Sequence, residues 1–88
     1  MSRGSMRAEY DVAKVEAVLL VVAADLYPRR LSVRDLSLEI VVDPDDDKEL
    51  EIARRAIGNL KGYGLFQEWP GEGIEPTPPG LRAVALLT

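Results

Sequence analysis

One stretch of this sequence decides the fold, and from Ala53 to Gly80 it reads ARRAIGNLKGYGLFQEWPGEGIEPTPPG. Apolar residues recur at helical spacing over its first part, and the GYG that follows supplies a stop for that helix. Two short runs, residues 65–69 and 74–77, flank the PGEG turn as strands, and prolines in the second run favour an edge position. The TPPG then leads into a last apolar segment, residues 81–87. The stretch therefore predicts a helix, a hairpin and a closing helix.

A longer apolar segment precedes this stretch, from about residue 8 to residue 27. Its apolar side chains recur at helical spacing and also cover other sides, which predicts a helix that is buried on more than one face. A partner subunit could supply the second face, or the rest of this chain could wrap around a central helix. Pro28 ends the helix, because the residue before a proline is pushed out of the helical region.

Two further helix starts lie between these segments. Ser32 suits an N-cap, with Asp35 three residues on, and predicts a short helix. Asp43 followed by Pro44 suits the start of the third helix, and the aspartates after them favour the positive end of its macrodipole. We therefore expect this helix to begin near Pro44 rather than near Lys48, and to run to about residue 62. The residues expected to face the core from these two helices are Val33, Leu36, Ile40, Leu50, Ala53, Ala56, Ile57 and Leu60.

Length and composition describe one small domain. Eighty-eight residues suit a single domain, which we place at residues 8–88, with residues 1–7 as a disordered N-terminus or cloning remnant. The chain has no cysteine or histidine, so it lacks thiolate and imidazole metal ligands and the usual general base near neutral pH. It also has no glycine-rich phosphate loop. We expect neither an enzyme nor a cofactor. The longest apolar run is too short to span a membrane, and no signal peptide is recognisable, so we expect a cytoplasmic protein without membrane contact.

Three local motifs link these segments to a known fold. LSVRDL at residues 31–36 has the pattern L-[ST]-x-x-[ED]-L, IGNLKGYGL at residues 57–65 ends a helix and enters a hairpin, and TPPG at residues 77–80 has the pattern T-P-x-G. In this order they resemble the winged helix-turn-helix domains of bacterial and archaeal transcriptional regulators, such as the MarR-like and PadR-like groups. The resemblance covers roughly residues 12–87. It implies an α+β, mostly α fold with a three-helix core, a β-hairpin wing and a short C-terminal helix.

The resemblance also implies a function. Such domains bind double-stranded DNA to regulate transcription, with the third helix in the major groove and the hairpin over the backbone or minor groove. Arg54 and Arg55 would contact phosphates or a guanine edge, and Asn59 would read an adenine. Arg34 and Lys48 would contact phosphates. The implied DNA-binding set is Arg34, Lys48, Arg54, Arg55, Asn59 and Lys61, all but the first on the third helix, whose outward positions also include Glu51 and Gly58. A homodimer through the first and last helices is the expected assembly.

The charge pattern departs from that of a usual DNA-binding wing. The formal net charge is −4, the third helix begins among acids, and no basic residue lies between Phe66 and Gly80. We expect the wing acids Glu68, Glu72 and Glu75 to be exposed and to subtract from the affinity that phosphate neutralisation supplies. An acidic winged-helix module that binds a protein partner instead of DNA is therefore the alternative. Arg54 and Arg55 could likewise pair with neighbouring carboxylates. Trp69 is expected to cover the core, with a stacking platform as its alternative.

Overall fold

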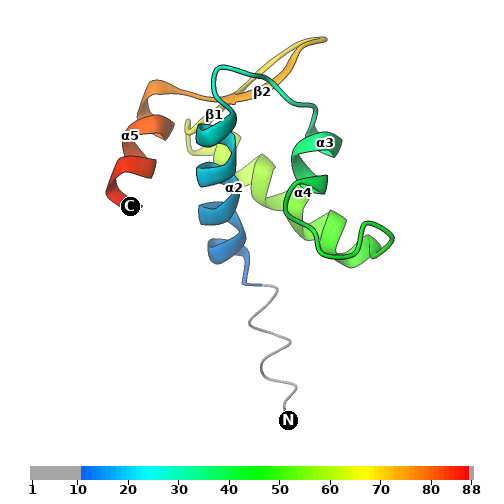
Figure 1. The fold of residues 1–88 in the computed structure, drawn as a ribbon. Helices are drawn as coiled ribbons and strands as arrows, with labels where there is room; N and C mark the ends of the chain where they lie inside the picture. Colours follow the sequence, from blue (N-terminus) through cyan, green and yellow to red (C-terminus); the bar gives the residue numbers. More distant parts are fainter. Residues whose placement is uncertain (1–10, 88) are drawn as a thin grey trace.

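The computed structural model describes residues 11–87 and has a small α+β, mostly helical architecture (Figure 1). The order of helix, short helix, helix, hairpin and helix predicted from the sequence is confirmed. The elements are α2 (Val12–Leu26), α3 (Val33–Leu38), α4 (Asp47–Gly62), β1 (Phe66–Trp69), β2 (Gly73–Pro76) and α5 (Pro78–Leu87). The expectations of a disordered or cloning-derived segment 1–7 and of a helix start near residue 8 lie outside the described residues.

Helix α2 is the central element. It packs against α4, which crosses it at an angle, and has α3 and α5 on opposite sides (Figure 1). Leu19, Leu20 and Ala23 are its buried residues, and they form one apolar cluster with Leu36 of α3, with Ala56, Ile57 and Leu60 of α4, and with Phe66 and Ile74 of the hairpin. The chain's own elements therefore cover much of α2, and one side of it, which includes the half-exposed Val18, stays open to solvent.

The N-cap of α3 is confirmed, whereas the predicted start of α4 is wrong. The Ser32 hydroxyl accepts a hydrogen bond from the Asp35 amide at 3.0 Å. Helix α4 begins at Asp47, three residues after Pro44, and Asp46 is its N-cap. The carboxylate of Asp43 instead accepts the Asp45 amide at 3.0 Å, and its carbonyl accepts the Asp46 amide at 2.9 Å. Asp43 therefore closes a turn ahead of the helix. Aspartate favours such turns as well as N-cap positions.

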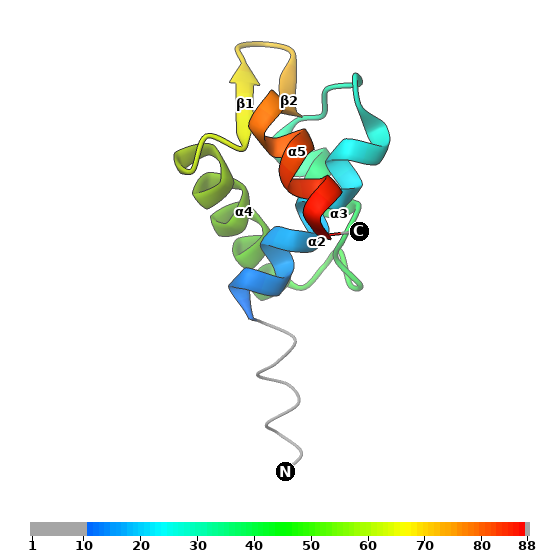
Figure 2. The same cartoon turned by 90° about the vertical axis from the view of Figure 1, so that its left-hand side faces the viewer.

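The hairpin pairs Phe66 with Pro76 and Trp69 with Gly73, within one residue of the predicted strand limits (Figure 2). A bridge that the sequence analysis did not predict covers the edge of β2: the Ile74 amide donates to the Leu31 carbonyl at 2.7 Å, and the Leu31 amide donates back at 3.2 Å. Gly73 permits this approach, because its φ is 117° and a Cβ there would lie 2.6 Å from the Leu31 carbonyl oxygen. The linker between α2 and α3 is thereby fixed to the wing.

The TPPG motif starts α5 earlier than predicted, at Pro78 instead of residue 81. Thr77 is the cap, since its hydroxyl accepts the Gly80 amide at 3.1 Å and donates to the Gly64 carbonyl at 2.6 Å. Proline suits the first helical position, which needs no amide proton, so Pro78 belongs to the helix. Gly80 lies so close to the backbone that a Cβ would be 2.2 Å from the Leu65 carbonyl oxygen. The motif thus joins the start of α5 to the end of α4.

Candidate nucleic-acid interface

The outward face of α4 carries Arg54 and Arg55, and both are exposed. The buried residues of α4 lie on the opposite side of the helix, so these two positions point away from the core. The Arg54 guanidinium lies 3.9 Å from the Glu51 carboxylate, and more than half of each side chain is exposed. Such a loose surface pair leaves Arg54 open to other anions. Arg55 forms no ion pair with any residue in the described range, and Gly58, also exposed, leaves open space beside it on the same face.

Asn59 does not face outward as the sequence analysis expected, whereas Lys61 does lie outward but is ion-paired within the chain. The Asn59 amide donates to the Glu16 carboxylate of α2 at 2.8 Å and is partly buried, so it faces the neighbouring helix and not solvent. Lys61 is exposed, but its ammonium group donates to Glu68 of β1 at 2.7 Å. The remaining two predicted residues are exposed, with Lys48 on the first turn of α4 and Arg34 on α3. Of the six predicted DNA-binding residues, Asn59 therefore faces α2, and Lys61 is ion-paired with Glu68 of the hairpin.

A pocket brings Arg34 and Arg54 together across the gap between α3 and α4. Its volume is about 340 Å³, and its lining consists of Val33, Arg34, Ser37, Leu50 and Arg54. No carboxylate is among the described residues that line it. The two arginines are twenty positions apart in the sequence, and both border this pocket because α3 packs against α4.

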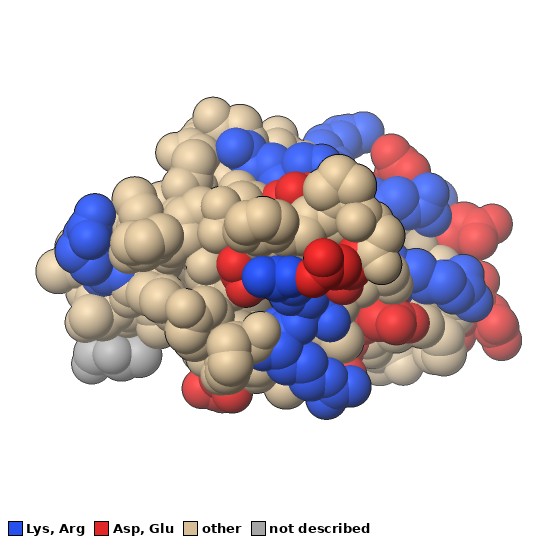
Figure 3. Space-filling model, turned by 90° about the horizontal axis from the view of Figure 1, so that it is seen from above, with Lys and Arg blue, Asp and Glu red and all other residues tan. Residues whose placement is uncertain are grey.

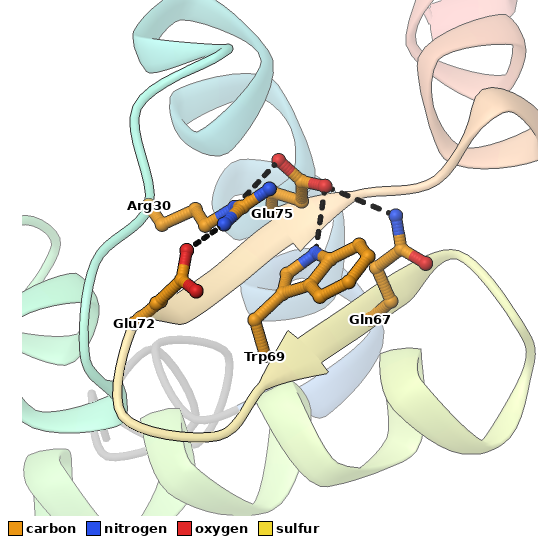
Figure 4. Close-up of polar contacts among 5 residues, drawn as sticks. All are labelled: Arg30, Gln67, Trp69, Glu72 and Glu75. Atoms are coloured by element: carbon orange, nitrogen blue, oxygen red, sulfur yellow. Dashed lines mark hydrogen bonds and ion pairs between the residues drawn. The ribbon is translucent and has the colours of Figure 1, made fainter.

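The wing carries a polar network that the sequence analysis missed (Figure 4). The Glu75 side chain is at its centre, and Glu75 is only 8% exposed, against the expectation of a solvated carboxylate. One of its oxygens accepts Arg30 Nε at 3.2 Å, and the other accepts Gln67 Nε2 at 3.1 Å and Trp69 Nε1 at 2.8 Å. The Arg30 guanidinium also pairs with Glu72. Every wing acid therefore has a basic partner, because Glu68 pairs with Lys61.

The electrostatics of this network favour the ionised pair. Burial by itself raises the pKa of Glu75, but the hydrogen bonds from Trp69, Arg30 and Gln67, together with the positive charge of Arg30, bring that pKa below its ordinary value. The hydrogen bond that Arg30 donates to Glu75 is the main cause that raises the pKa of Arg30, which therefore stays charged. The network joins the one positive charge of Arg30 to two carboxylates, the mostly buried Glu75 and the exposed Glu72, so the Arg30 charge is not free to bind a distant partner.

Trp69 does not cover the core, and Arg30 occupies one face of its ring. Phe66 and Ile74 point into the core, so the alternation of the strands turns Trp69, Gln67 and Glu75 to the other face of the hairpin. Trp69 is 40% exposed there, and the Arg30 guanidinium lies over its ring at 4.5 Å from the centroid. The indole therefore stabilises the Arg30–Glu75 pair through a cation–π contact with Arg30 and a hydrogen bond donated to Glu75.

Surface charge is mixed where the wing meets the rest of the domain. Seen from above, basic and acidic side chains alternate over the middle and the α3 side, and the α5 side is largely uncharged (Figure 3). Among residues 11–87, no group of three or more acidic side chains is placed to hold a metal ion. None of the helices in that range combines the length and apolar character that crossing a bilayer requires. Comparisons with protein-family models, curated proteins and solved structures found no match to this chain.

Proposed function

We propose that this chain is a winged-helix domain that binds double-stranded DNA as a small cytoplasmic transcriptional regulator, with α4 in the major groove and without enzymatic activity. The observation that carries the proposal is the outward face of α4, where Arg54 and Arg55 are exposed beside the open surface at Gly58. A helix enters the major groove only through a face that no other part of its own chain covers. The order of three helices, a hairpin and a closing helix is compatible with this docking.

Internal pairing of the acids supports the proposal. The wing acids Glu68, Glu72 and Glu75 are paired with Lys61 and Arg30, so they repel phosphates less than free carboxylates would. At the start of α4, the carboxylates of Asp46 and Glu49 accept backbone amides, and so does that of Asp43. The charge of Asp46 is thereby partly offset by the amide dipoles of the helix start, and the charges of Glu49 and Asp43 by amides of the preceding loop. The unfavourable charge near α4 is smaller than a count of acidic residues indicates.

We further propose that the domain forms a homodimer through α2 and α5. A mostly apolar groove of about 350 Å³ runs between these helices and is lined by Ala17, Val18, Val21, Val22 and Leu87. Val18 and Leu87 are at least half exposed in the single chain, and Leu86 beside them is almost fully exposed. A twofold axis through this groove would bury those side chains against their own copies. Sedimentation equilibrium tests this part, since a monomer at all concentrations up to about millimolar would remove it.

The DNA-binding proposal is tested with random-sequence duplex DNA at low salt, followed by fluorescence anisotropy. The variant Arg54→Ala/Arg55→Ala is compared with Lys14→Ala/Arg82→Ala, which removes the same charge from exposed positions on α2 and α5. Glu16 contacts α4, so Lys14, two residues earlier in the same helix, lies on a different side. We expect the α4 variant to bind at least tenfold more weakly and to have a salt slope shallower by about 2, whereas the control changes little.

Two results contradict the proposal. Equal losses in the two variants would mean that net charge alone, and not the α4 face, controls binding. An absence of binding by the unaltered chain at low salt would favour the second candidate, an acidic winged-helix module that binds a protein partner. The mixed charge of the face in Figure 3 and the internal pairing of Arg30 and Lys61 are the observations that favour this second candidate.

A further inference from the structure

The two carboxamide side chains of this sequence, Asn59 on α4 and Gln67 on β1, are both hydrogen-bonded within the chain. The Asn59 amide donates to Glu16 of α2 at 2.8 Å. The Gln67 amide donates to Glu75 at 3.1 Å in the network of Figure 4. A carboxamide recognises adenine by presenting its oxygen to N6 and its NH₂ group to N7 at the same time. Neither side chain is placed to do so while these contacts hold.

The outward face of α4 offers a different set of groups. The structure describes every residue of this helix, and its exposed positions hold charged residues and two glycines. They are Asp47, Lys48, Glu51, Arg54, Arg55, Gly58, Lys61 and Gly62. No exposed position of α4 carries a methyl group that would pack against the methyl group of thymine. The face therefore lacks the side chains that recognise an A·T pair in the major groove.

Glu51 and Arg54 instead match the edges of a G·C pair. Guanine presents the acceptors N7 and O6, which suit a guanidinium, and cytosine presents the N4 amino donor, which suits a carboxylate. Adenine suits a carboxylate less well, because its amino group lies beside the acceptor N7. The Glu51 carboxylate lies 3.9 Å from the Arg54 guanidinium, and both side chains are more than half exposed. This separation is close to the rise of about 3.4 Å between successive base pairs.

We infer that α4 selects G·C base pairs, with Arg54 donating to a guanine and Glu51 accepting from an adjacent cytosine. The inference rests on the proposed function and names the class of duplex that the domain binds. Glu51 is then a specificity-determining residue that lowers general affinity. Its negative charge repels the phosphates of every duplex, whereas its carboxylate finds a matching donor only where cytosine is present.

The test compares the affinities of the full chain for three short duplexes of equal length, by fluorescence anisotropy at one low salt concentration. The first has a central block of mixed G·C pairs, the second has A·T pairs in that block, and the third is the first with inosine in place of each guanine of the block. An inosine·cytosine pair keeps the major-groove pattern of G·C but lacks the minor-groove amino group. We expect the first and third duplexes to bind alike. The second should bind at least tenfold more weakly, which is within the discrimination that one or two base contacts supply.

The variant Glu51→Gln tests the assigned residue by a gain of binding. It keeps the size of the side chain and places a carboxamide on the outward face, where it can pair with adenine. We expect the ratio of G·C to A·T affinity to fall at least threefold, through tighter binding of the A·T duplex. The matched control Asp25→Asn removes the same charge from an exposed position of α2 and should leave this ratio unchanged. Circular dichroism shows whether each variant is folded.

Each contrary result overturns a stated part of the inference. Equal affinity of the unaltered chain for the G·C and A·T duplexes would overturn base selection and leave DNA binding by α4 intact. Weak binding of the inosine duplex would assign the selection to the minor groove and not to α4. An unchanged ratio in Glu51→Gln, or an equal change in Asp25→Asn, would overturn the role of Glu51. Absence of binding to all three duplexes would refute the proposed function itself.

Discussion

Replacement of Glu75 by glutamine tests the wing network most directly. The change keeps the size of the side chain and removes its negative charge. The carboxylate uses both oxygens, one for Arg30 and one for Gln67 and Trp69. An amide has one acceptor, so if its oxygen faces the indole, its NH₂ group meets Arg30 Nε, and two donors then oppose each other. We expect Glu75→Gln to fold and to be less stable.

The magnitude follows from the contacts. A hydrogen bond to a charged group contributes about 1.5–3 kcal/mol, and loss of one partner in a buried site also leaves the other partner unsatisfied. The Arg30 side chain is 30% exposed, so water replaces part of the lost interaction. We therefore expect a loss of about 1–2 kcal/mol in the free energy of unfolding. For a domain of this size, a change of 1 kcal/mol lowers Tm by about 4–8 °C.

Thermal unfolding followed by circular dichroism at neutral pH measures this loss. The matched control is Glu68→Gln in the same hairpin, because Glu68 is 46% exposed and accepts one hydrogen bond, from Lys61. Exposed pairs of this kind contribute little, so the control should lose less than half as much. A Tm for Glu75→Gln equal to that of the unaltered chain, or equal losses in both variants, would refute the argument that burial makes Glu75 the important acid.

The pH dependence gives an independent readout of the same group. The pKa of Glu75 is below its ordinary value of 4.5, so its charge stabilises the folded state above that value. This contribution declines as the pH falls below 4.5 and is lost as the pH passes through the lowered folded-state pKa. The Tm difference between the unaltered chain and Glu75→Gln should therefore be constant near neutral pH and shrink in acid. A difference that does not change between pH 7 and strong acid would mean that the charge of Glu75 is unimportant.

Three further substitutions test the backbone assignments, each by urea denaturation of the full chain. Gly80→Ala should cost about 1–3 kcal/mol, because the new Cβ would lie 2.2 Å from the Leu65 carbonyl oxygen, and an unchanged midpoint would contradict that close approach. Gly58→Ala should instead stabilise the chain by about 0.5–1 kcal/mol, since nothing lies within 4 Å of the added atom on α4, and a destabilised variant would show that this face is not open. Ser32→Ala should cost about 1 kcal/mol by removing the cap on the Asp35 amide, whereas an equal stability would mean that α3 does not depend on its cap.

Local chemistry was sufficient to predict most of the fold. Ser32 and Thr77 act on amides within three residues of themselves, so their roles could be inferred from short stretches of sequence. The start of α4 could not be inferred in this way, because Asp43 and Asp46 both have the chemistry of an N-cap. The Glu49 carboxylate decides between them, since it reaches back to the Val42 amide at 2.8 Å and holds the preceding loop. A contact of that kind depends on the path of the loop and not on any one residue.

The site was less predictable, since its contacts join distant parts of the chain. Arg30 and Glu75 are 45 positions apart in the sequence and meet because the backbone of Leu31 pairs with that of Ile74. No sequence motif predicts this bridge. Asn59 is one position from the buried Leu60, and only the position of α2 decides that its amide turns inward to Glu16. Exposure of Arg54 and Arg55, in contrast, follows from helical periodicity alone.

Among the predicted DNA-binding cations, the pairing pattern separates those near the hairpin from those on α3 and the outward face of α4. Arg30 is held by the wing acids and Lys61 by Glu68, so neither contributes a free charge at the hairpin. The predicted DNA-binding cations without an ion pair in the described chain are Arg34, Lys48 and Arg55, and Arg54 has only its loose, exposed pair with Glu51; all four lie on α3 and α4. A duplex bound by this domain must therefore approach α3 and α4 more closely than the hairpin.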